Sequence, residues 1–295
     1  MNRSLLFAPG DDEKKMKKAG GIGADSVILD LEDSVSDSRK DLARDLVCSF
    51  IENIRSSCVE YYVRINPVDS KHHHQDLEQV VASSPTGIVL PKCSGGAEVK
   101  MICQKIQELE NKYSIAVGRT AILPVATETA AAVFTLGTYA GASMRTSGLT
   151  WGAEDLGAAV GASVNLNSDK SWTSPYEMVR ALCLFGAHAA EVPAIDTVMA
   201  DFRDLAQLRI VCDKARQDGF TGKMAIHPAQ VEIINNAFSP SENEVAHAQR
   251  VLEAFNSNPE AGTLQLDGKM IDKPHIVQSQ RIIKLAESIA AKSEK

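Results

Sequence analysis

Eight short apolar segments alternate along this chain with stretches that have the composition of amphipathic helices. Most of these segments are apolar throughout rather than at every second residue, which is typical of strands buried on both faces of a parallel sheet. Eight strands alternating with helices favour a (β/α)8 TIM barrel over an open doubly wound sheet, and no GxGxxG turn follows the first segment. We predict the strands at residues 3–8, 26–31, 61–65, 87–90, 121–126, 148–151, 189–192 and 223–226.

The pattern changes after Phe238, where Ser239-Pro240-Ser241-Glu242 has the residues of a helix start. We predict a helix from there to about Phe255, then a linker, a hairpin-like turn at Asp267-Gly268 and a last helix to about Ala290. The sequence therefore predicts a TIM-barrel catalytic domain at residues 1–238 and a C-terminal helical lid or arm at residues 239–295.

Composition excludes several classes of protein. Hydrophobic residues make up 44% of the 295 residues, enough for a large core, yet no apolar run approaches the ~18–20 residues of a membrane span. Pro9-Gly10 interrupts the first segment too early for a signal peptide, so we expect a cytoplasmic enzyme, or one in an organelle matrix if a targeting segment was removed. The net charge of -7 argues against general nucleic-acid binding. The six cysteines have no spacing from which a zinc site can be assembled.

Two carboxylates, Glu128 and Asp155, stand at the ends of apolar runs in successive predicted strands. The C-terminal ends of the strands are where TIM-barrel enzymes build their active sites. Two acids there, with few other fixed charges nearby in sequence, suit one hard divalent cation that keeps positions open for a substrate's oxygens. Either acid alone could instead cap the helix that follows it, but the pair favours a metal site.

Charged side chains also follow other predicted strands. The second strand ends in Asp30-Leu31-Glu32-Asp33, the third in Arg64, the fourth is followed by Lys92, and the eighth by His227. An arginine at a strand end can hold a carboxylate with two parallel hydrogen bonds. Because a bound metal can polarise a carbonyl beside that carboxylate, this rim predicts cleavage or formation of a carbon–carbon bond next to a ketone.

Six motifs occur along the chain: RSLLFAPG at residues 3–10, DLEDSV at 30–35, VRINP at 63–67, LPK at 90–92, GAED at 152–155 and GKMIDKP at 268–274. In this order they resemble the citrate lyase β-chain-like family of the HpcH/HpaI aldolase/citrate lyase superfamily. Within it, the chain looks most similar to the stand-alone malyl-CoA and citramalyl-CoA lyases. Each motif alone is weak, but six in order are specific, and the resemblance runs from Arg3 to the last predicted helix.

The resemblance implies Mg²⁺ held by Glu128 and Asp155, with coenzyme A entering as part of the substrate. Arg64 matches the arginine that holds the substrate's carboxylate. The residues expected to bind the substrate or its CoA moiety are Phe7, Lys14, Lys18, Arg64, Gly152, Ala153, Ile226 and His227. Lys14 and Lys18 lie four residues apart and share one helix face. A solvated helix face for the lysines, core packing for Phe7 and a capping role for His227 are the alternatives.

Asp272 matches the aspartate that, in CoA lyases of this type, reaches into a neighbouring subunit's site and exchanges a proton with the methyl carbon of acetyl-CoA. The resemblance therefore implies a homo-oligomer, a trimer, with Asp272 supplied in trans. A carboxylate is a weak base for so weak a carbon acid, so the site must exclude water. The alternative is a turn-forming Asp before Lys273-Pro274. The base for the substrate's hydroxyl proton stays open between a metal-bound water and an acid of the Glu32/Asp33 cluster.

The expected activity is Mg²⁺-dependent cleavage of citramalyl-CoA or malyl-CoA to acetyl-CoA and pyruvate or glyoxylate. One departure concerns Thr129-Ala130-Ala131-Ala132, which follows Glu128 where many citrate lyase β-chains have Ser-Pro and a glycine. This departure weakens the alternative of a citrate lyase β-chain acting on a citryl group carried by an acyl carrier protein. A thioesterase or malate-synthase side activity also stays open. A non-enzymatic barrel is disfavoured by the joint presence of Arg64, Glu128, Asp155 and Asp272.

Overall fold

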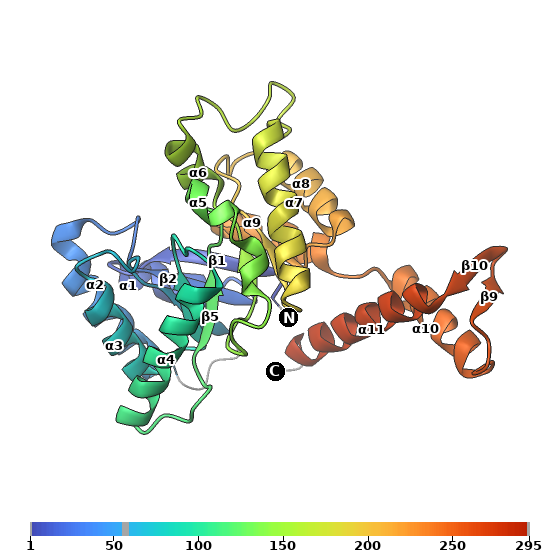
Figure 1. The fold of residues 1–295 in the computed structure, drawn as a ribbon, viewed down its shortest axis with the longest axis horizontal. Coiled ribbons are helices and arrows are strands. Elements are labelled where there is room, and N and C mark those ends of the chain that lie inside the picture. Colours follow the sequence, from blue (N-terminus) through green and yellow to red (C-terminus); the bar gives the residue numbers. More distant parts are fainter. Residues whose placement is uncertain (1, 55–58, 294–295) are drawn as a thin grey trace. The chain divides into compact units, whose positions relative to one another are not determined.

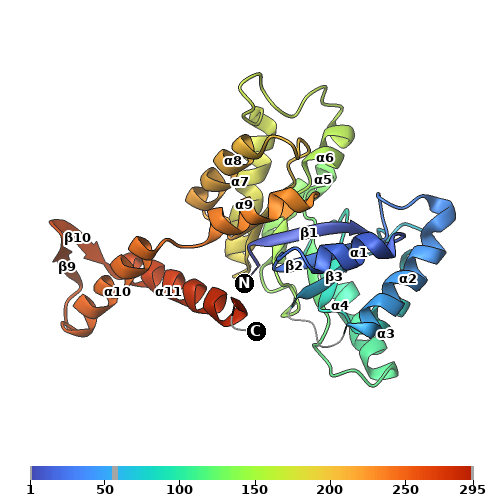
Figure 2. The ribbon, with the colours of Figure 1, turned by 180° about the vertical axis from the view of Figure 1, so that it is seen from behind.

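The computed structural model describes residues 2–54 and 59–293, and within them eight parallel strands form a ring with helices on its outside (Figures 1 and 2). Neighbouring strands follow the order β5-β4-β3-β2-β1-β8-β7-β6, and the bridges Ile122–Thr146 and Val125–Thr150 join the two ends of this series. The predicted TIM barrel is confirmed. The strands are β1 (Ser4–Pro9), β2 (Ser26–Asp30), β3 (Glu60–Arg64), β4 (Gly87–Leu90), β5 (Ala121–Pro124), β6 (Leu149–Thr150), β7 (Ala194–Asp196) and β8 (Gly222–Ala225).

The helices of the barrel are amphipathic. In the second α-helix, Val47, Phe50 and Ile51 are buried while Asp45 and Glu52 are exposed, as a period of 3.6 residues requires. The helical elements are α1 (Glu13–Gly20), η1 (Asp37–Arg39), α2 (Lys40–Asn53), α3 (His73–Ser83), α4 (Gly96–Lys112), α5 (Ala130–Val133), η2 (Leu136–Tyr139), α6 (Ala153–Val160), α7 (Ser174–Ala189), α8 (Leu205–Asp218) and α9 (Pro228–Phe238).

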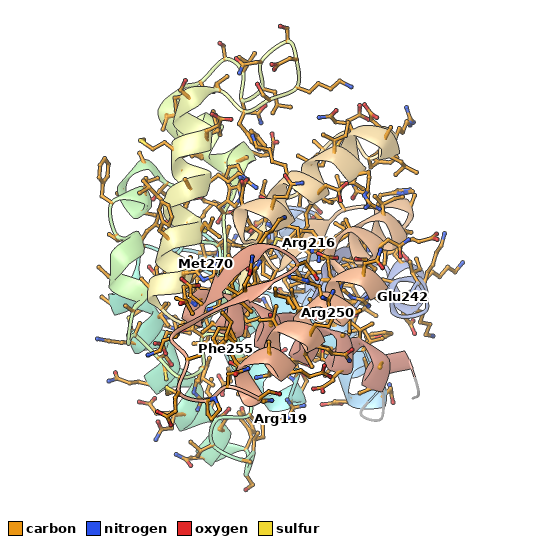
Figure 3. All side chains as sticks on the ribbon, turned by 90° about the vertical axis from the view of Figure 1, so that its right-hand side faces the viewer. Arg119, Arg216, Glu242, Arg250, Phe255 and Met270 are labelled. Carbon is orange, nitrogen blue, oxygen red and sulfur yellow. The ribbon has the colours of Figure 1, made fainter. Side chains whose placement is uncertain are left out.

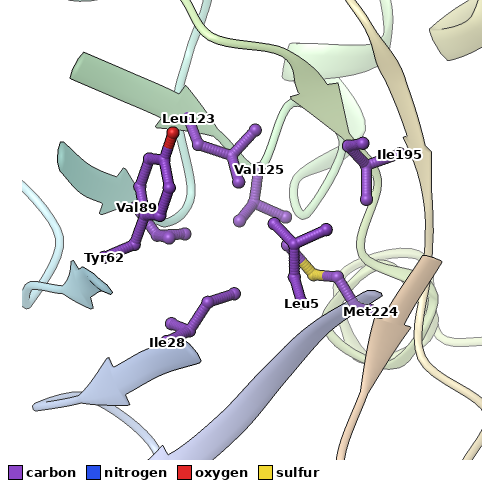
Figure 4. Packing of buried hydrophobic residues seen from close by; sticks show 8 residues of the cluster. All are labelled: Leu5, Ile28, Tyr62, Val89, Leu123, Val125, Ile195 and Met224. Carbon is purple, nitrogen blue, oxygen red and sulfur yellow. The ribbon is translucent and has the colours of Figure 1, made fainter. Parts of the chain in front are cut away.

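Apolar side chains from nearly every strand fill the interior of the ring (Figure 4). Branched residues and one tyrosine dominate, as in the packed centre of other TIM barrels. This filled centre leaves the strand ends and their loops as the place for chemistry. The cluster consists of Leu5, Ile28, Tyr62, Val89, Leu123, Val125, Ile195 and Met224.

The prediction of the seventh strand at residues 189–192 is wrong. Helix α7 continues to Ala189, and the strand lies later, at Ala194–Asp196. Small residues between Gly186 and Ala190 prolong the helix, because alanine has the highest helix propensity. The chain then turns through Glu191, whose φ is 56°, and passes Pro193 before the strand begins.

The chain divides into two compact units, Asn2–Ala237 and Phe238–Lys295. The second contains α10 (Glu242–Asn256), the antiparallel strands β9 (Thr263–Leu266) and β10 (Lys269–Asp272), and α11 (Lys273–Ser293). Asp267 and Gly268 form the predicted hairpin turn, with φ values of 51° and 77° that suit a two-residue type I′ turn. Phe255, on α10, packs with Val251 and Ile271 in this unit's own core, and Figure 3 labels it with Arg250 and Met270.

Among the described residues, no helix combines the length and the apolar character needed to cross a bilayer.

Candidate active site

Arg64 and Asp30 form a two-pronged ion pair at the C-terminal ends of β3 and β2. The two residues are register partners in the parallel sheet, so their side chains meet at the same edge. Arg64 Nε donates to Oδ1 of Asp30 at 2.7 Å and Nη2 donates to Oδ2 at 2.8 Å. Burial alone would raise the pKa of Asp30, but the guanidinium and two backbone N–H donors hold that pKa below its usual value.

The remaining nitrogen of Arg64 meets two further acids. Nη1 lies 3.1 Å from Oε2 of Glu32 and 3.3 Å from Oδ2 of Asp33, and the guanidinium carbon lies 4.8 Å from the ring centroid of Phe7. Asp30 and Glu32 are buried, whereas the Asp33 side chain is 55% exposed. Asp33 is therefore the acid that an incoming carboxylate could replace on Arg64 at the smallest structural cost.

Lys92 contacts three acids at the neighbouring strand ends of the barrel. Its Nζ lies 2.5 Å from Oε1 of Glu32 and 3.4 Å from Oδ1 of Asp155. Its backbone N–H donates to Oε2 of Glu128. Three carboxylates from three different segments therefore converge on one residue.

The electrostatics of Glu128 fit a cation site. Its carboxyl is buried, and burial together with the nearby charges of Glu32 and Asp155 raises its pKa to about 8, against the opposing hydrogen bond from Lys92. A divalent cation beside these acids would offset that repulsion. Among residues 2–54 and 59–293, no group of three or more His, Cys, Asp or Glu side chains is arranged as metal ligands. Two carboxylates with water and substrate oxygens are nevertheless a usual magnesium ligand set.

Gly152 allows Glu128 to approach the start of α6. A Cβ at this position would lie 2.5 Å from Cγ of Glu128, so any side chain would displace the carboxylate. The Gly152 N–H donates to Oγ1 of Thr127 at 3.2 Å, and Ala153 is the buried first residue of the helix. Asp155 follows in the first turn of α6. The structure therefore places it at a helix start rather than at the strand end itself.

Other residues predicted to bind CoA lie on separate elements. Lys14 and Lys18 are exposed on α1, and within residues 2–54 and 59–293 neither has an ion-pair partner. Ile226 is exposed after β8, and the ring of His227 stacks on Phe202 with centroids 4.5 Å apart. No hydrogen bond, ion pair or ring contact among the described residues joins these four positions to Arg64 or Glu128.

Asp272 lies in the second compact unit, as the last residue of β10 and directly before α11. Its Oδ1 lies 2.6 Å from Nδ1 of His275, so the two side chains are hydrogen-bonded. His275 was not among the site residues predicted from the sequence. Its position three residues after Asp272 at a helix start is the signal that could have revealed the pair.

A buried ion pair next to the site was also missed. Asp196, at the end of β7, accepts hydrogen bonds from Nζ of Lys223 and Nε1 of Trp151, both at 2.8 Å. Trp151 directly precedes Gly152, so this pair supports the strand end that leads into α6. A lysine within the apolar segment of β8 was the available signal, because a buried lysine needs a partner.

Comparisons with known proteins identify the family of this chain. The family described as HpcH/HpaI aldolase/citrate lyase matches residues 3–228 of the chain. The chain belongs to this family. A second description, C-C bond lyase of the TIM-barrel fold, matches residues 188–290, which include Asp272. The resemblance seen in the six motifs is confirmed, and the members of this family include carbon–carbon lyases.

Several members of the HpcH/HpaI family align with nearly the whole chain. The citrate lyase subunit beta of Leuconostoc mesenteroides subsp. cremoris is 31% identical, covering 98% of this chain and 94% of that protein. The (3S)-malyl-CoA thioesterase of Cereibacter sphaeroides is 32% identical, with coverages of 98% and 96%. The mitochondrial citramalyl-CoA lyase of Mus musculus is 30% identical, with coverages of 98% and 87%.

Among solved structures, protein CitE from Mycobacterium tuberculosis in complex with magnesium, acetoacetate and coenzyme A superposes with a TM-score of 0.76. It is 30% identical, and the alignment covers 97% of this chain and 98% of that one. This likeness supports the closed barrel followed by helices.

Proposed function

We propose that this chain is a Mg²⁺-dependent carbon–carbon lyase that cleaves citramalyl-CoA or malyl-CoA to acetyl-CoA and a 2-keto acid, pyruvate or glyoxylate. The observation that carries the proposal is the acid cluster of Glu32, Glu128 and Asp155 beside the two-pronged Arg64. An excess of carboxylates next to an arginine fits one cation together with one carboxylate-bearing substrate. Relatives named for citramalyl-CoA and malyl-CoA chemistry support the choice of substrate.

In this proposal Glu128 and Asp155 hold Mg²⁺, which when bound supplies a Lewis acid for the keto-acid carbonyl. Arg64 receives the substrate's carboxylate in exchange for Asp33, and the guanidinium lies over the ring of Phe7. The buried position of Glu128 and the pairing of Arg64 with Asp30 fix both groups before substrate arrives. Such preorganisation lowers the cost of assembling charge in the transition state.

The start of α6 completes the keto-acid side of the proposed site. Backbone N–H groups in the first turn of a helix have no partner within the helix, and they favour negative charge. Gly152 and Ala153 bring this turn beside Glu128. Lys14 and Lys18, exposed and four residues apart on α1, are assigned to the phosphates of CoA, with Ile226 and His227 along the same moiety.

Asp272 of a neighbouring copy, in a homotrimer, is assigned to protonate the methyl carbon of the acetyl-CoA enolate. The base that accepts the hydroxyl proton remains one of the two candidates named from the sequence. Within its own unit Asp272 is hydrogen-bonded to His275 at the junction of β10 and α11, away from the Asp267-Gly268 turn.

The test is acetyl-CoA release from (S)-citramalyl-CoA and from malyl-CoA, with and without Mg²⁺, by the wild-type chain, Glu128→Ala and Asp272→Ala. We expect Mg²⁺-dependent cleavage by the wild type and a fall of roughly 10²–10³-fold or more in each variant. Mixing the two variants should restore part of the activity, because some mixed oligomers would contain one intact site. No restoration by stable mixed oligomers would contradict the supply of Asp272 in trans.

Two other outcomes would overturn the proposed activity. Release of malate and CoA without acetyl-CoA would identify a thioesterase, as the relative from Cereibacter sphaeroides is named. Failure on both free thioesters, with cleavage of citryl-acyl carrier protein in the presence of partner subunits, would identify a citrate lyase β-chain. The 31% identity to such a subunit over 98% of the chain makes this the second candidate.

A further inference from the structure

Lys92 adopts a backbone conformation that is unusual for a residue with a side chain. It follows Pro91 at the end of β4 and has a φ of 50°, in the left-handed region that glycine adopts most easily. In this conformation its N–H donates to the buried Glu128 carboxylate. The backbone of Lys92 therefore holds one proposed metal ligand, and this bond does not depend on which side chain stands at position 92.

The Lys92 side chain acts on two other acids. Its ammonium lies 2.5 Å from Glu32 Oε1 and 3.4 Å from Asp155 Oδ1. The Glu32 side chain is only 5% exposed, whereas the side chains of Lys92 and Asp155 are 32% and 34% exposed. The short contact to Glu32 is thus the protected one. The longer contact to Asp155 is open to solvent and to competing cations.

These positions and charges imply that the Lys92 ammonium and a divalent cation would compete for the same carboxylates. An ammonium and a divalent cation attract the same carboxylate oxygens, and they repel one another. Arg64 also contacts Glu32, but Lys92 is the cationic residue with contacts to Glu32, Glu128 and Asp155 alike among the described residues. A cation that binds Asp155 must replace the ammonium there.

We propose that Lys92 is a built-in counter-cation, which holds the acid cluster together before a divalent cation binds and gives up Asp155 when it does. The inference rests on the proposed metal site at Glu128 and Asp155. After this exchange the ammonium stays on Glu32. The side chain thereby stabilises the metal-free protein and weakens divalent cation binding, while the backbone N–H continues to orient Glu128.

The experiment measures Mn²⁺ binding to the full-length chain, stripped of metal with a chelator, by the loss of the free-ion electron paramagnetic resonance signal. The variants are Lys92→Met, which removes the charge, and Lys92→Arg, which keeps it. Lys92→Asn is the second uncharged variant, because asparagine tolerates positive φ. Lys71→Met is the matched control, because it removes the same charge from an exposed pair with Asp37.

We expect Lys92→Met and Lys92→Asn to bind Mn²⁺ about tenfold more tightly than the wild type. Lys92→Arg and Lys71→Met should stay within about twofold of it. Thermal unfolding without metal should begin at a lower temperature in the two uncharged variants, and saturating Mn²⁺ should narrow that difference. These readouts do not require turnover.

The outcomes separate this inference from the proposed function. Equal affinities of the wild type and both uncharged variants, with binding lost in Glu128→Gln, would leave the metal site standing and overturn the counter-cation. Weaker binding in the uncharged variants would also overturn it, since the ammonium would then support the site. Absence of binding in the wild type and in all Lys92 variants would remove the proposed metal site and this inference together.

Discussion

Two ion pairs of the barrel are built in the same way but carry opposite charge balances. Asp30 with Arg64, and Asp196 with Lys223, each join register partners on neighbouring parallel strands. Asp196 is one acid facing two cations, Lys223 at 2.8 Å and Arg180 at 3.5 Å. Arg64 is one cation facing three acids.

Uncompensated charge lies around Arg64 and not around Asp196. The Asp196 pair is buried and hydrogen-bonded to its surroundings. Lys223 is 1% exposed, and it also donates to the carbonyl of Thr197 at 2.6 Å. Charges of this kind stabilise the fold only because every hydrogen-bonding group has a partner. At the β2–β5 rim the acids outnumber the cations, and one of them, Asp33, is exposed. Surplus negative charge near solvent can be compensated by a ligand. Around Asp196 there is no such surplus, because Lys223 and Arg180 are matched by Asp196 and by Asp218, which lies 2.7 Å from Arg180.

The largest expected effect comes from making the same substitution in both regions. Lys223→Met leaves the buried Asp196 short of its main partner and should lower the free energy of unfolding by about 3 kcal/mol. Lys92→Met, whose side chain is partly exposed, should cost about 1 kcal/mol or less, because solvent screens the acids around it. Urea unfolding at neutral pH measures both. Equal losses would show that the two regions do not differ as described.

Acid titration offers a second, smaller distinction. Burial alone would raise the pKa of Asp196, but Lys223 and Arg180 hold it below the usual carboxyl value. Its contribution to stability is therefore present above the unfolded-state pKa of about 3.9 and is lost as the pH falls through the lower folded value. Asp196→Asn should be less stable than the wild type by about 2 kcal/mol at pH 7, and this gap should shrink below about pH 4. Urea midpoints between pH 3 and 7 test this, and a constant gap would contradict it.

The smallest expected effect concerns Asp33. If this exposed acid competes with a ligand carboxylate for Arg64, Asp33→Asn should tighten pyruvate binding about two- to threefold at low salt, with less effect at high salt. Calorimetric titration with pyruvate in the presence of Mg²⁺ measures this. Asp37→Asn is the control, because Asp37 is also an exposed acid but pairs with Lys71 and His72 instead. Tightening of the same size in the control would assign the effect to net charge.

The fold was largely predictable because its signals are local. Continuous apolar runs such as the one at β4 were located to the residue, and the Asp267-Gly268 turn identified the C-terminal hairpin. The seventh strand was misplaced because the alanine-rich end of α7 is apolar in either conformation. Periodicity cannot separate a short strand from the last turn of a buried helix.

The site was less predictable because it depends on pairing between strands. The residue types at the ends of β2 and β3 were evident, but the sequence does not state the register that sets Arg64 against Asp30. For the same reason our reading of Arg64 as a holder of substrate missed the acids already around it. The contacts of Lys92 with acids from three segments could not be inferred, because they require the barrel to be closed first.

The left-handed backbone at position 92 and the acids around it place opposing demands on the residue that stands there. The φ of 50° favours glycine or asparagine, whereas the acids around it favour a cation. In a library of all residues at this position, selected for resistance to thermal unfolding with saturating divalent cation, glycine and asparagine should become enriched. Selected for survival without divalent cation, the same library should retain lysine. The residue retained at position 92 would therefore depend on whether divalent cation was available during selection.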